Sequence, residues 1–389
     1  MAAATTHNAR NSAWRIARRG QVPFGRRSLF HDRVRVAMSA GALAFAVLLV
    51  LLLRGIMDGT VQKSTSYIDH VGADVFVATS GVTNMALAAS TLPESSVETL
   101  SEQPGVARAG GILRINAIVS TAQDSRPGIL IGYDPDRSLG GPWKLSRGRG
   151  VEATDETVLD TELAKELHVS LGSEVSIAGG TFRVVGLSTE TAAIAGKLAF
   201  VHLQRAQEIL RLPAVVSFVL LDLAPGVNRE AFVSSLAAAS SDIEVLTRET
   251  LSRNDRKLLA RLFVQPINVM STIGLLVGLA IVGLTMYTTT AERLHDFGVL
   301  KAIGAPNQFL LATVASQAIY LGAGGFVLGL AGAWAVGPVI VRLVPDIGVL
   351  VTAKAVGQAL AAVFTMSLVG AVGPLVRILR VDPLLVFKR

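Results

Sequence analysis

The sequence contains no cysteine, which excludes disulfide bonds, thiolate zinc sites and cysteine nucleophiles. It also lacks the phosphate-binding motif G-x-x-x-x-G-K-[ST], the metal-binding motif H-E-x-x-H and the nucleophile elbow G-x-S-x-G. Only 17% of the 389 residues are charged, whereas 51% are hydrophobic. This composition predicts a membrane protein rather than a soluble enzyme.

Long apolar runs are what the sequence has in place of catalytic motifs. The first run, residues 36–53, holds 18 residues without a charge, about the shortest length that crosses a bilayer core. Its apolar side chains favour insertion by about 3–6 kcal/mol, and Arg35 and Arg54 bound it because a buried arginine would cancel much of that gain. We expect further spans over 265–290, 307–341 and 355–376. The third run, interrupted by glycines and prolines, is longer than a span needs, so we expect a helix over 309–335 and a short outer segment through Arg342, Pro345 and Asp346.

Basic residues lie beside the first and last spans. Eight arginines and one aspartate precede the first span, and the tail 377–389 carries four basic residues against Asp382. The positive-inside rule therefore places the N-terminal segment 1–35 and this tail in the cytoplasm. A cleaved signal peptide is the alternative to a retained first span, but no small-x-small site follows Leu53. We expect the basic segment to contact membrane lipids rather than nucleic acid.

Residues 54–264 lie on the far side of the membrane in this topology, and they suffice for one sizeable or two small domains. Alternating apolar residues predict strands over 73–78, 112–119, 128–133, 173–179, 181–187 and 215–223. Helices are predicted over 93–102, 160–167, 203–210 and 228–238. This mixture predicts an extracytoplasmic α+β domain, with a hairpin at Gly179-Gly180. Helical stalks are expected over 53–69 and 250–265, and an outer loop over 342–354.

Candidate catalytic and metal-ligating residues do not form any recognisable motif in the sequence. The six histidines form no close metal-ligand pair, and Asp134 and Asp136 predict a turn rather than a cation site. The glycine-rich run 322–332 lies inside an apolar span with no strand before it. The spacing of Gly325 and Gly329 therefore predicts close helix packing rather than phosphate binding. We expect no catalytic residue, cofactor or metal, and a membrane-anchored enzyme is disfavoured.

The charged stretch AERLHDFGVLKAIGAP, residues 291–306, lies between the second and third spans and so in the cytoplasm. Its DFG triplet does not indicate a kinase, because the lysine-bearing strand and the catalytic loop are missing. A bare turn does not need Phe297, Val299, Leu300 and Ile303 outside the bilayer, so these residues predict a surface that contacts a partner or the membrane. The three-residue spacing of its apolar residues drifts around a helix. We expect a short docking helix, and a plain charged turn is the alternative.

Four motifs accompany a layout of one span, a large outer domain and three further spans. They are GADVFVA (72–78), LDTELAKELHVSLGSEVSIAGGTFRVVGL (159–187), ERLHDFGVLKAIGAP (292–306) and LRVDPLLVFKR (379–389). With these motifs the chain resembles the FtsX/MacB-like permease family of ABC transporters, of the mechanotransmission type, and within it the DevC-like branch. The third motif is the most specific, because most of its residues agree in register with the family's ER-x-x-E-(I/F)-G-(V/I)-L-(R/K)-A-(I/L)-G-A pattern.

The resemblance implies a permease subunit of a bacterial inner membrane that is not itself an enzyme. A separate cytoplasmic ABC ATPase would hydrolyse ATP, and a second permease copy, expected to be identical, would complete the membrane part; a periplasmic adaptor protein is a further partner. ATP hydrolysis would move the extracytoplasmic domain and drive export or extraction of a lipid, lipoprotein or peptide. The alternative is a signalling module, without transport, that activates an extracytoplasmic cell-wall hydrolase. The residues implied to couple to the ATPase are Glu292, Arg293, Phe297, Gly298, Val299, Leu300, Lys301 and Gly304.

Overall fold

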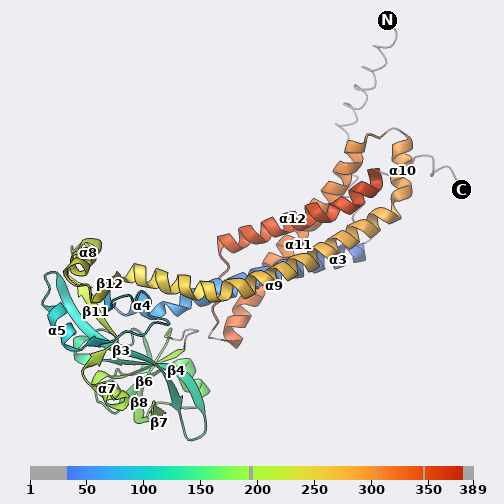
Figure 1. The fold of residues 1–389 in the computed structure, drawn as a ribbon. Helices are drawn as coiled ribbons and strands as arrows, with labels where there is room; N and C mark the ends of the chain where they lie inside the picture. The colour runs from blue at the N-terminus through green and yellow to red at the C-terminus, as the bar shows by residue number, and fades with distance from the viewer. Residues whose placement is uncertain (1–32, 192–195, 304, 345–346, 380–389) are drawn as a thin grey trace. The chain divides into compact units, whose positions relative to one another are not determined.

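The computed structural model describes residues 33–191, 196–303, 305–344 and 347–379. The chain divides into two compact units (Figure 1). We call them the helical unit, with Met1–Gly55, Pro266–Pro338 and Val351–Arg389, and the sheet unit, with Ile56–Gln265 and Val339–Leu350. The expected basic segment 1–35 falls almost wholly outside the described residues, as does most of the tail 377–389.

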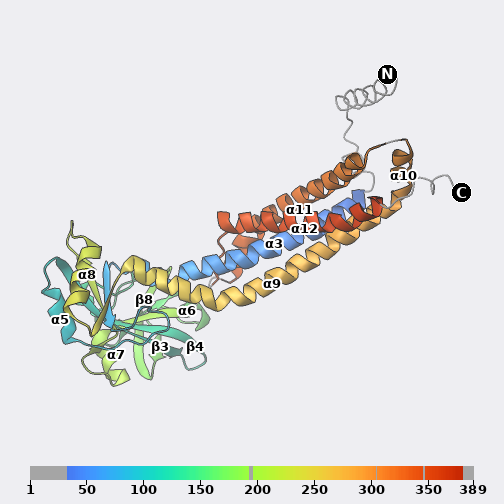
Figure 2. The same ribbon diagram turned by 45° about the horizontal axis from the view of Figure 1, so that its top comes forward.

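The helical unit contains most of four long helices, which run alongside one another (Figure 2). They are α3 (Arg33–Ser64), α9 (Arg248–Glu292), α11 (Asn307–Leu343) and α12 (Ala353–Leu379). Each contains a stretch that is long and apolar enough to cross a membrane. Leu43 and Leu51 of α3, Val314 of α11 and Val363 of α12 belong to one buried apolar cluster. The described residues therefore contain four helices suited to the four spans that the apolar runs predict.

The third span is longer than the sequence predicts. Helix α11 is continuous from Asn307 to Leu343 and passes through Pro338, so the expectation of a helix that ends near residue 335 is wrong. Proline is tolerated inside a membrane helix because neighbouring helices and local adjustments satisfy the backbone groups that it frees. Residues 339–343, which follow Pro338 and begin with the apolar Val339, continue the helix. Pro345 and Asp346, expected in the outer loop, lie outside the described residues.

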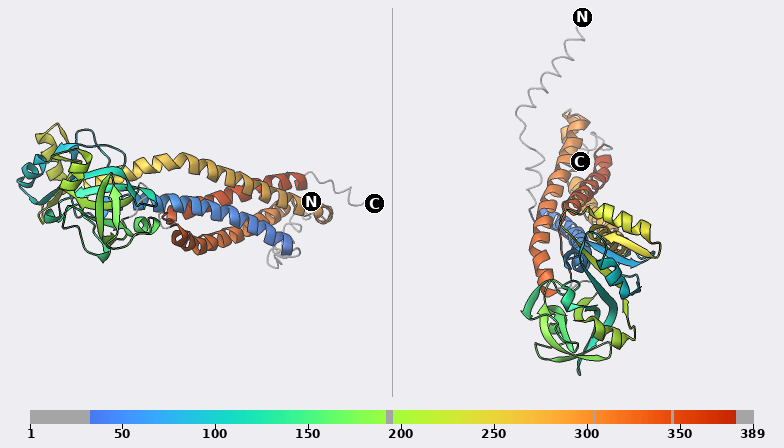
Figure 3. Two further views of the ribbon diagram at one scale, coloured as in Figure 1. Left: turned by 90° about the horizontal axis from the view of Figure 1, so that it is seen from below. Right: turned by 90° about the vertical axis from the view of Figure 1, so that its left-hand side faces the viewer.

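A ten-stranded sheet forms the sheet unit, with the order β12-β1-β11-β3-β4-β9-β6-β8-β5, and β7 pairs with β3 and β8. The strands, cyan to yellow-green, gather into one body in both views of Figure 3. Their bounds are β1 Val75–Thr79, β3 Val106–Ser120, β4 Ser125–Tyr133, β5 Leu145–Gly148, β6 Glu156–Asp160, β7 Glu174–Ile177, β8 Gly180–Ser188, β9 Lys197–His202, β11 Phe218–Leu223 and β12 Ile243–Thr247. The pairs β4–β9 and β6–β8 are parallel, and the other pairs are antiparallel.

Both faces of the sheet are buried. Because side chains alternate along a strand, Val75 and Val77 of β1 lie in one apolar cluster and Phe76 lies in another. The first cluster includes residues of α5 (Ser95–Ser101), α6 (Thr161–Glu166), α7 (Leu203–Leu210) and α8 (Arg229–Ala239). The second includes Tyr67 of α4 (Ser66–His70) and Leu251 of α9. The first turns of α9 thus form part of the core of the sheet unit.

Two elements of the sheet unit differ from the prediction in their bounds, and local contacts explain both differences. The helix predicted from residue 93 begins at Ser95, because Pro93 belongs to β2 (Leu92–Pro93), which pairs with β10 (Val215–Val216). The hairpin of β7 and β8 is present, but Ala178 and Gly179 form its turn, both with positive φ. Gly180 is instead the first residue of β8, where a Cβ would come within 2.2 Å of Ile209.

Candidate functional site

A helical corner joins the second and third spans. Helix α9 ends at Glu292, and Arg293 leaves the helical region with φ −103° and ψ 11°. Helix α10 (Leu294–Ala302) follows, and the Phe297 N–H donates to the Arg293 carbonyl at 3.0 Å. The chain leaves α10 through a bond from the Ala305 N–H to the Leu300 carbonyl, also 3.0 Å, and α11 begins two residues later. Gly304, an expected coupling residue, lies outside the described residues.

One face of α10 packs into the helical unit. Phe297 is only 5% exposed and belongs to the same buried cluster as Met286 of α9 and Leu310 of α11. Gly298 is also buried, and Leu300 packs partly against the cluster. The expectation that Phe297 is left uncovered is therefore wrong, because neighbouring helices of the same chain supply its contacts. Phe297 holds α10 in place and does not reach the surface.

The other face of α10 is open. Val299 is 40% exposed and Ile303, four residues later, is 73% exposed. Residues four apart share a helix face, so these two side chains form an apolar pair at the surface. His295 and Asp296 are exposed beside them, and so is Glu292 at the end of α9. The corner thus exposes an apolar pair together with polar side chains that precede it in the chain, a combination found in contact surfaces for protein partners.

A cation–π contact fixes the end of α9 next to this corner. The Arg377 guanidinium of α12 lies 4.7 Å from the centroid of the Tyr287 ring and also donates to the Tyr287 hydroxyl. The sequence predicts Arg377 in the cytoplasmic tail and no role for Tyr287. Both lie at the ends of apolar runs, where aromatic and basic residues commonly anchor membrane helices, and that position was the available signal.

Two glycines of α11 allow close contact with α3. A Cβ at Gly325 would lie 2.8 Å from side-chain carbons of Leu43, and a Cβ at Gly329 would lie 2.6 Å from the Cβ of Val47. Such distances are shorter than carbon atoms tolerate, so only glycine fits at these positions. The two residues lie four apart on α11 and bring its backbone against α3, as small residues do between membrane helices.

The first turns of α9 are bound to the sheet unit by polar contacts. The Asp255 carboxylate is 2% exposed and accepts a hydrogen bond from the Met85 N–H at 2.8 Å. Burial raises the pKa of Asp255 to about 6, although the N–H groups of Met85 and Ala86 and the charge of Arg114 act in the opposite direction. Asn254 also donates to the Thr83 carbonyl at 2.9 Å. These contacts tie α9 to the loop that follows β1.

Neighbouring residues tie the same turns to α4. The Arg256 Nη2 lies 2.5 Å from the Asp69 carboxylate, and its Nε donates to the Thr65 hydroxyl at 2.9 Å. The sequence predicts helical stalks over 53–69 and 250–265, which include these turns. It did not identify Asp255 or Arg256, because their partners are far away in the sequence.

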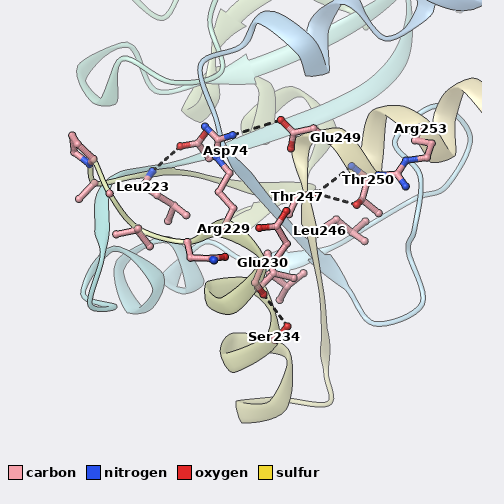
Figure 4. A pocket seen from close by; sticks show the side chains of 17 residues that line it. Asp74, Leu223, Arg229, Glu230, Ser234, Leu246, Thr247, Glu249, Thr250 and Arg253 are labelled. Carbon is pink, nitrogen blue, oxygen red and sulfur yellow. Dashed lines mark hydrogen bonds and ion pairs between the residues drawn. The ribbon is translucent and has the colours of Figure 1, made fainter.

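A pocket of about 730 Å³ lies in the sheet unit between the N-terminal turns of α8 and α9 (Figure 4). The Asp74 carboxylate inside it lies 2.6 Å from Arg229 and accepts from the Leu223 N–H at 3.3 Å. Arg229 also lies 3.7 Å from Glu249. Arg229 therefore pairs with both carboxylates, and among the described residues no three histidine, aspartate or glutamate side chains are grouped to hold a metal ion. Asp134 caps a short 3₁₀ turn by accepting from the Asp136 N–H, as the turn prediction requires.

Most of the chain matches known protein families and relatives. Residues 36–239 match the family profile of the MacB-like periplasmic core domain, and residues 268–383 match that of the FtsX-like permease C-terminal domain. An uncharacterized ABC transporter permease of Mycobacterium tuberculosis is 26% identical over 364 residues, which cover 90% of this chain and 94% of that protein. Another, of Methanocaldococcus jannaschii, is 25% identical over 200 residues, 48% of this chain and 50% of that protein. Among solved structures, the periplasmic region of MacB from Actinobacillus actinomycetemcomitans matches with 16% identity and a TM-score of 0.38, covering 48% of this chain and 94% of that one.

Proposed function

This chain belongs to the FtsX/MacB-like family of ABC transporter permeases, and on that premise we propose that it couples ATP hydrolysis by a separate cytoplasmic ATPase to movement of its extracytoplasmic domain. The sheet unit is that domain, and the movement drives export or extraction of a lipid, lipoprotein or peptide. Both chain termini lie in the cytoplasm in this proposal. The working assembly contains a second, identical copy of the chain, and an adaptor protein on the far side of the membrane is a further partner.

The observation that carries the proposal is the two-sided helix α10. Its buried face, with Phe297, joins it to the helical unit, so that a push on α10 is passed to the spans. Its exposed face, with Val299 and Ile303, offers an apolar contact to an ATPase. Glu292, Arg293 and Lys301 supply charges around that contact. Gly298 allows close helix approach, and Leu300, whose carbonyl accepts from the Ala305 N–H, shapes the exit towards α11.

Helix α9 supports a route from α10 to the extracytoplasmic domain. It is continuous from Arg248 to Glu292, and it includes both the second span and the turns that are packed into the sheet unit. Asp255 fixes those turns to the loop after β1. A displacement at one end of a continuous helix is carried along it, so α9 is the element through which we expect the stroke to pass.

A double variant of the exposed apolar pair tests the coupling role of α10. We expect Val299→Asp/Ile303→Asp to lower stimulation of the cognate ATPase about tenfold or more and to abolish co-purification, because charges would replace the apolar centre of the contact. The matched control is Leu87→Asp, at a residue that is 64% exposed in the sheet unit. It should leave both measurements unchanged, and the thermal stability of each variant should equal that of the wild type. Normal stimulation by the double variant would overturn the assignment of α10.

A further inference from the structure

A second cleft of about 500 Å³ lies in the sheet unit where α9 passes α4 and the end of α3. The residues that line it are Val61, Asp69, Glu249, Ser252, Arg253, Arg256, Lys257 and Ala260. Three of these are cations and two are carboxylates. The pattern of ion pairs decides which charges remain available to a ligand.

Both carboxylates already have partners. Asp69 lies 2.5 Å from Arg256, and Glu249 lies 3.2 Å from Arg248 and 3.7 Å from Arg229. Arg253 and Lys257, by contrast, are exposed and form no hydrogen bond or ion pair within the part of the chain that the structure describes. They are four residues apart on α9 and so share one face of the helix. Two unpaired cations therefore face the same cleft.

The Ser252 hydroxyl is an independent sign of a missing ligand. Ser252 is 4% exposed, it lines the cleft, and its oxygen has no hydrogen-bond partner among the described residues. Buried hydroxyl groups are nearly always hydrogen-bonded, because an unpaired one loses its water without compensation. A ligand oxygen that bears negative charge would accept from this hydroxyl and pair with Arg253 and Lys257. Phosphate is the common group with this chemistry.

The apolar part of the cleft indicates that the phosphate is attached to a lipid. Val61 and Ala260 form apolar wall next to the cations. The apolar span of α9 begins at Val264, seven residues after Lys257, which is about 10 Å along a helix. Val264 lies on nearly the same helix face as Lys257. The two cations thus lie on the same helix face as the start of the apolar span, and about the depth of a lipid headgroup layer away from it. This position suits the phosphate of an anionic lipid better than a soluble phosphate.

We propose that this cleft binds the phosphate of an anionic lipid headgroup, with Arg253, Lys257 and the Ser252 hydroxyl as its contacts. The inference rests on the proposed function in one respect, since it makes an anionic lipid the class of cargo that the permease moves. Arg256 shapes the cleft but is held by Asp69.

The test measures lipid binding by the full chain in nanodiscs, without the ATPase. Native mass spectrometry would compare retention of phosphatidylglycerol with that of phosphatidylcholine. We expect wild type to prefer phosphatidylglycerol and Arg253→Gln/Lys257→Gln to lose that preference, by about fivefold for each cation removed. Ser252→Ala should weaken retention of phosphatidylglycerol without a change in net charge. The control Arg147→Gln/Arg211→Gln removes the same charge at two exposed arginines elsewhere in the sheet unit and should keep the preference.

Two further measurements separate the sources of the phosphate and the two proposals. Inorganic phosphate at millimolar concentration should not displace the lipid; displacement would assign the site to a free phosphate and overturn the lipid proposal. Equal retention by wild type and Arg253→Gln/Lys257→Gln, or an equal loss in the control pair, would also overturn it. ATPase stimulation, measured on the same variants, tests the coupling role of α10 independently of lipid binding. Either proposal can therefore be refuted while the other is retained.

Discussion

In the sheet unit, the first turns of α9 make several buried polar contacts beside the packing of Leu251, whereas in the helical unit its last turns are held mainly by apolar packing, with one contact between Arg377 and Tyr287. Asp255 binds the Met85 N–H and lies near Arg114. At the other end, Phe297 is enclosed by apolar side chains of α9 and α11. The strength of a hydrogen bond to an ionisable group depends on pH, because protonation changes the charge of that group. The stability of apolar packing depends instead on the volume and shape of the side chains. The same helix therefore has two anchors that different perturbations should break.

The largest expected effect separates the two faces of α10. Phe297→Ala removes a buried ring and leaves a cavity, so we expect the helical unit to lose about 3–5 kcal/mol of unfolding free energy. The matched change Val299→Ala, at an exposed position, should alter it by no more than about 0.5 kcal/mol. Unfolding of the full chain in mild detergent measures both. Equal losses would contradict the assignment of a buried and an exposed face.

The next effect concerns pH and the polar anchor. The pKa of Asp255 is about 6 in the folded chain, above its ordinary value of about 3.9, so the folded state binds the proton more tightly. Stability therefore falls as pH rises from about 4 to about 6, by up to about 3 kcal/mol, and it is regained on acidification. Asp255→Asn cannot ionise, so its stability relative to wild type should increase over that range.

The melting temperature of the full chain, followed between pH 4 and pH 7, measures this difference. Glu102→Gln, which removes an exposed carboxylate from the same unit, shows whether the effect is particular to Asp255. Parallel curves for wild type and Asp255→Asn would show that the polar anchor does not respond to pH.

A smaller effect tests the close packing of α11 against α3 in the helical unit. At Gly329 an added Cβ would lie 2.6 Å from the Cβ of Val47 and 2.7 Å from the Ala44 carbonyl oxygen. Gly329→Ala should therefore destabilise the chain by about 1–3 kcal/mol. At Gly324, on the same helix, an added Cβ meets no atom within 4 Å, and Gly324→Ala should stabilise it by about 0.5–1 kcal/mol. Thermal unfolding of the two variants should shift in opposite directions, and shifts of the same sign would refute close packing at Gly329.

The sequence predicted most of the secondary structure but not all of the sheet. Strands β1, β3, β4, β7, β8 and β11 lie at predicted segments, because each alternates or is rich in branched apolar residues. Besides the edge strands β5 and β12, two further strands were missed: β9, with Lys197 at its start, and β6, which runs from Glu156 to Asp160. Both lie inside the sheet with charged residues at their ends. Those charges are buried against partners from other elements, as Glu156 is by Arg149 and Arg183, and only the fold reveals the partners.

The sequence predicted a short helix between the second and third spans, but it did not predict which face of that helix is exposed. A three-residue spacing of apolar residues does not select one helix face, so the sequence could not distinguish Phe297 from Val299. Contacts with Leu310 and the rest of the buried cluster make that choice. Asp255 was hidden for a related reason, since its bond to Met85 joins residues 170 positions apart. Local patterns identify elements, whereas the burial of a polar group depends on contacts that are distant in the sequence.

The most direct test of the account is a distance measurement between the two units during ATP turnover. Because the chain has no cysteine, spin labels can be placed at Ala238→Cys on α8 and Val327→Cys on α11, both at exposed positions. Double electron–electron resonance, with labelled chains diluted among unlabelled ones, would compare the chain with and without its ATPase trapped in the ATP-bound state. We predict a shift of the distance distribution that disappears in Val299→Asp/Ile303→Asp. An unchanged distribution with bound, ATP-loaded ATPase would contradict the claim that the permease passes the stroke to its extracytoplasmic domain.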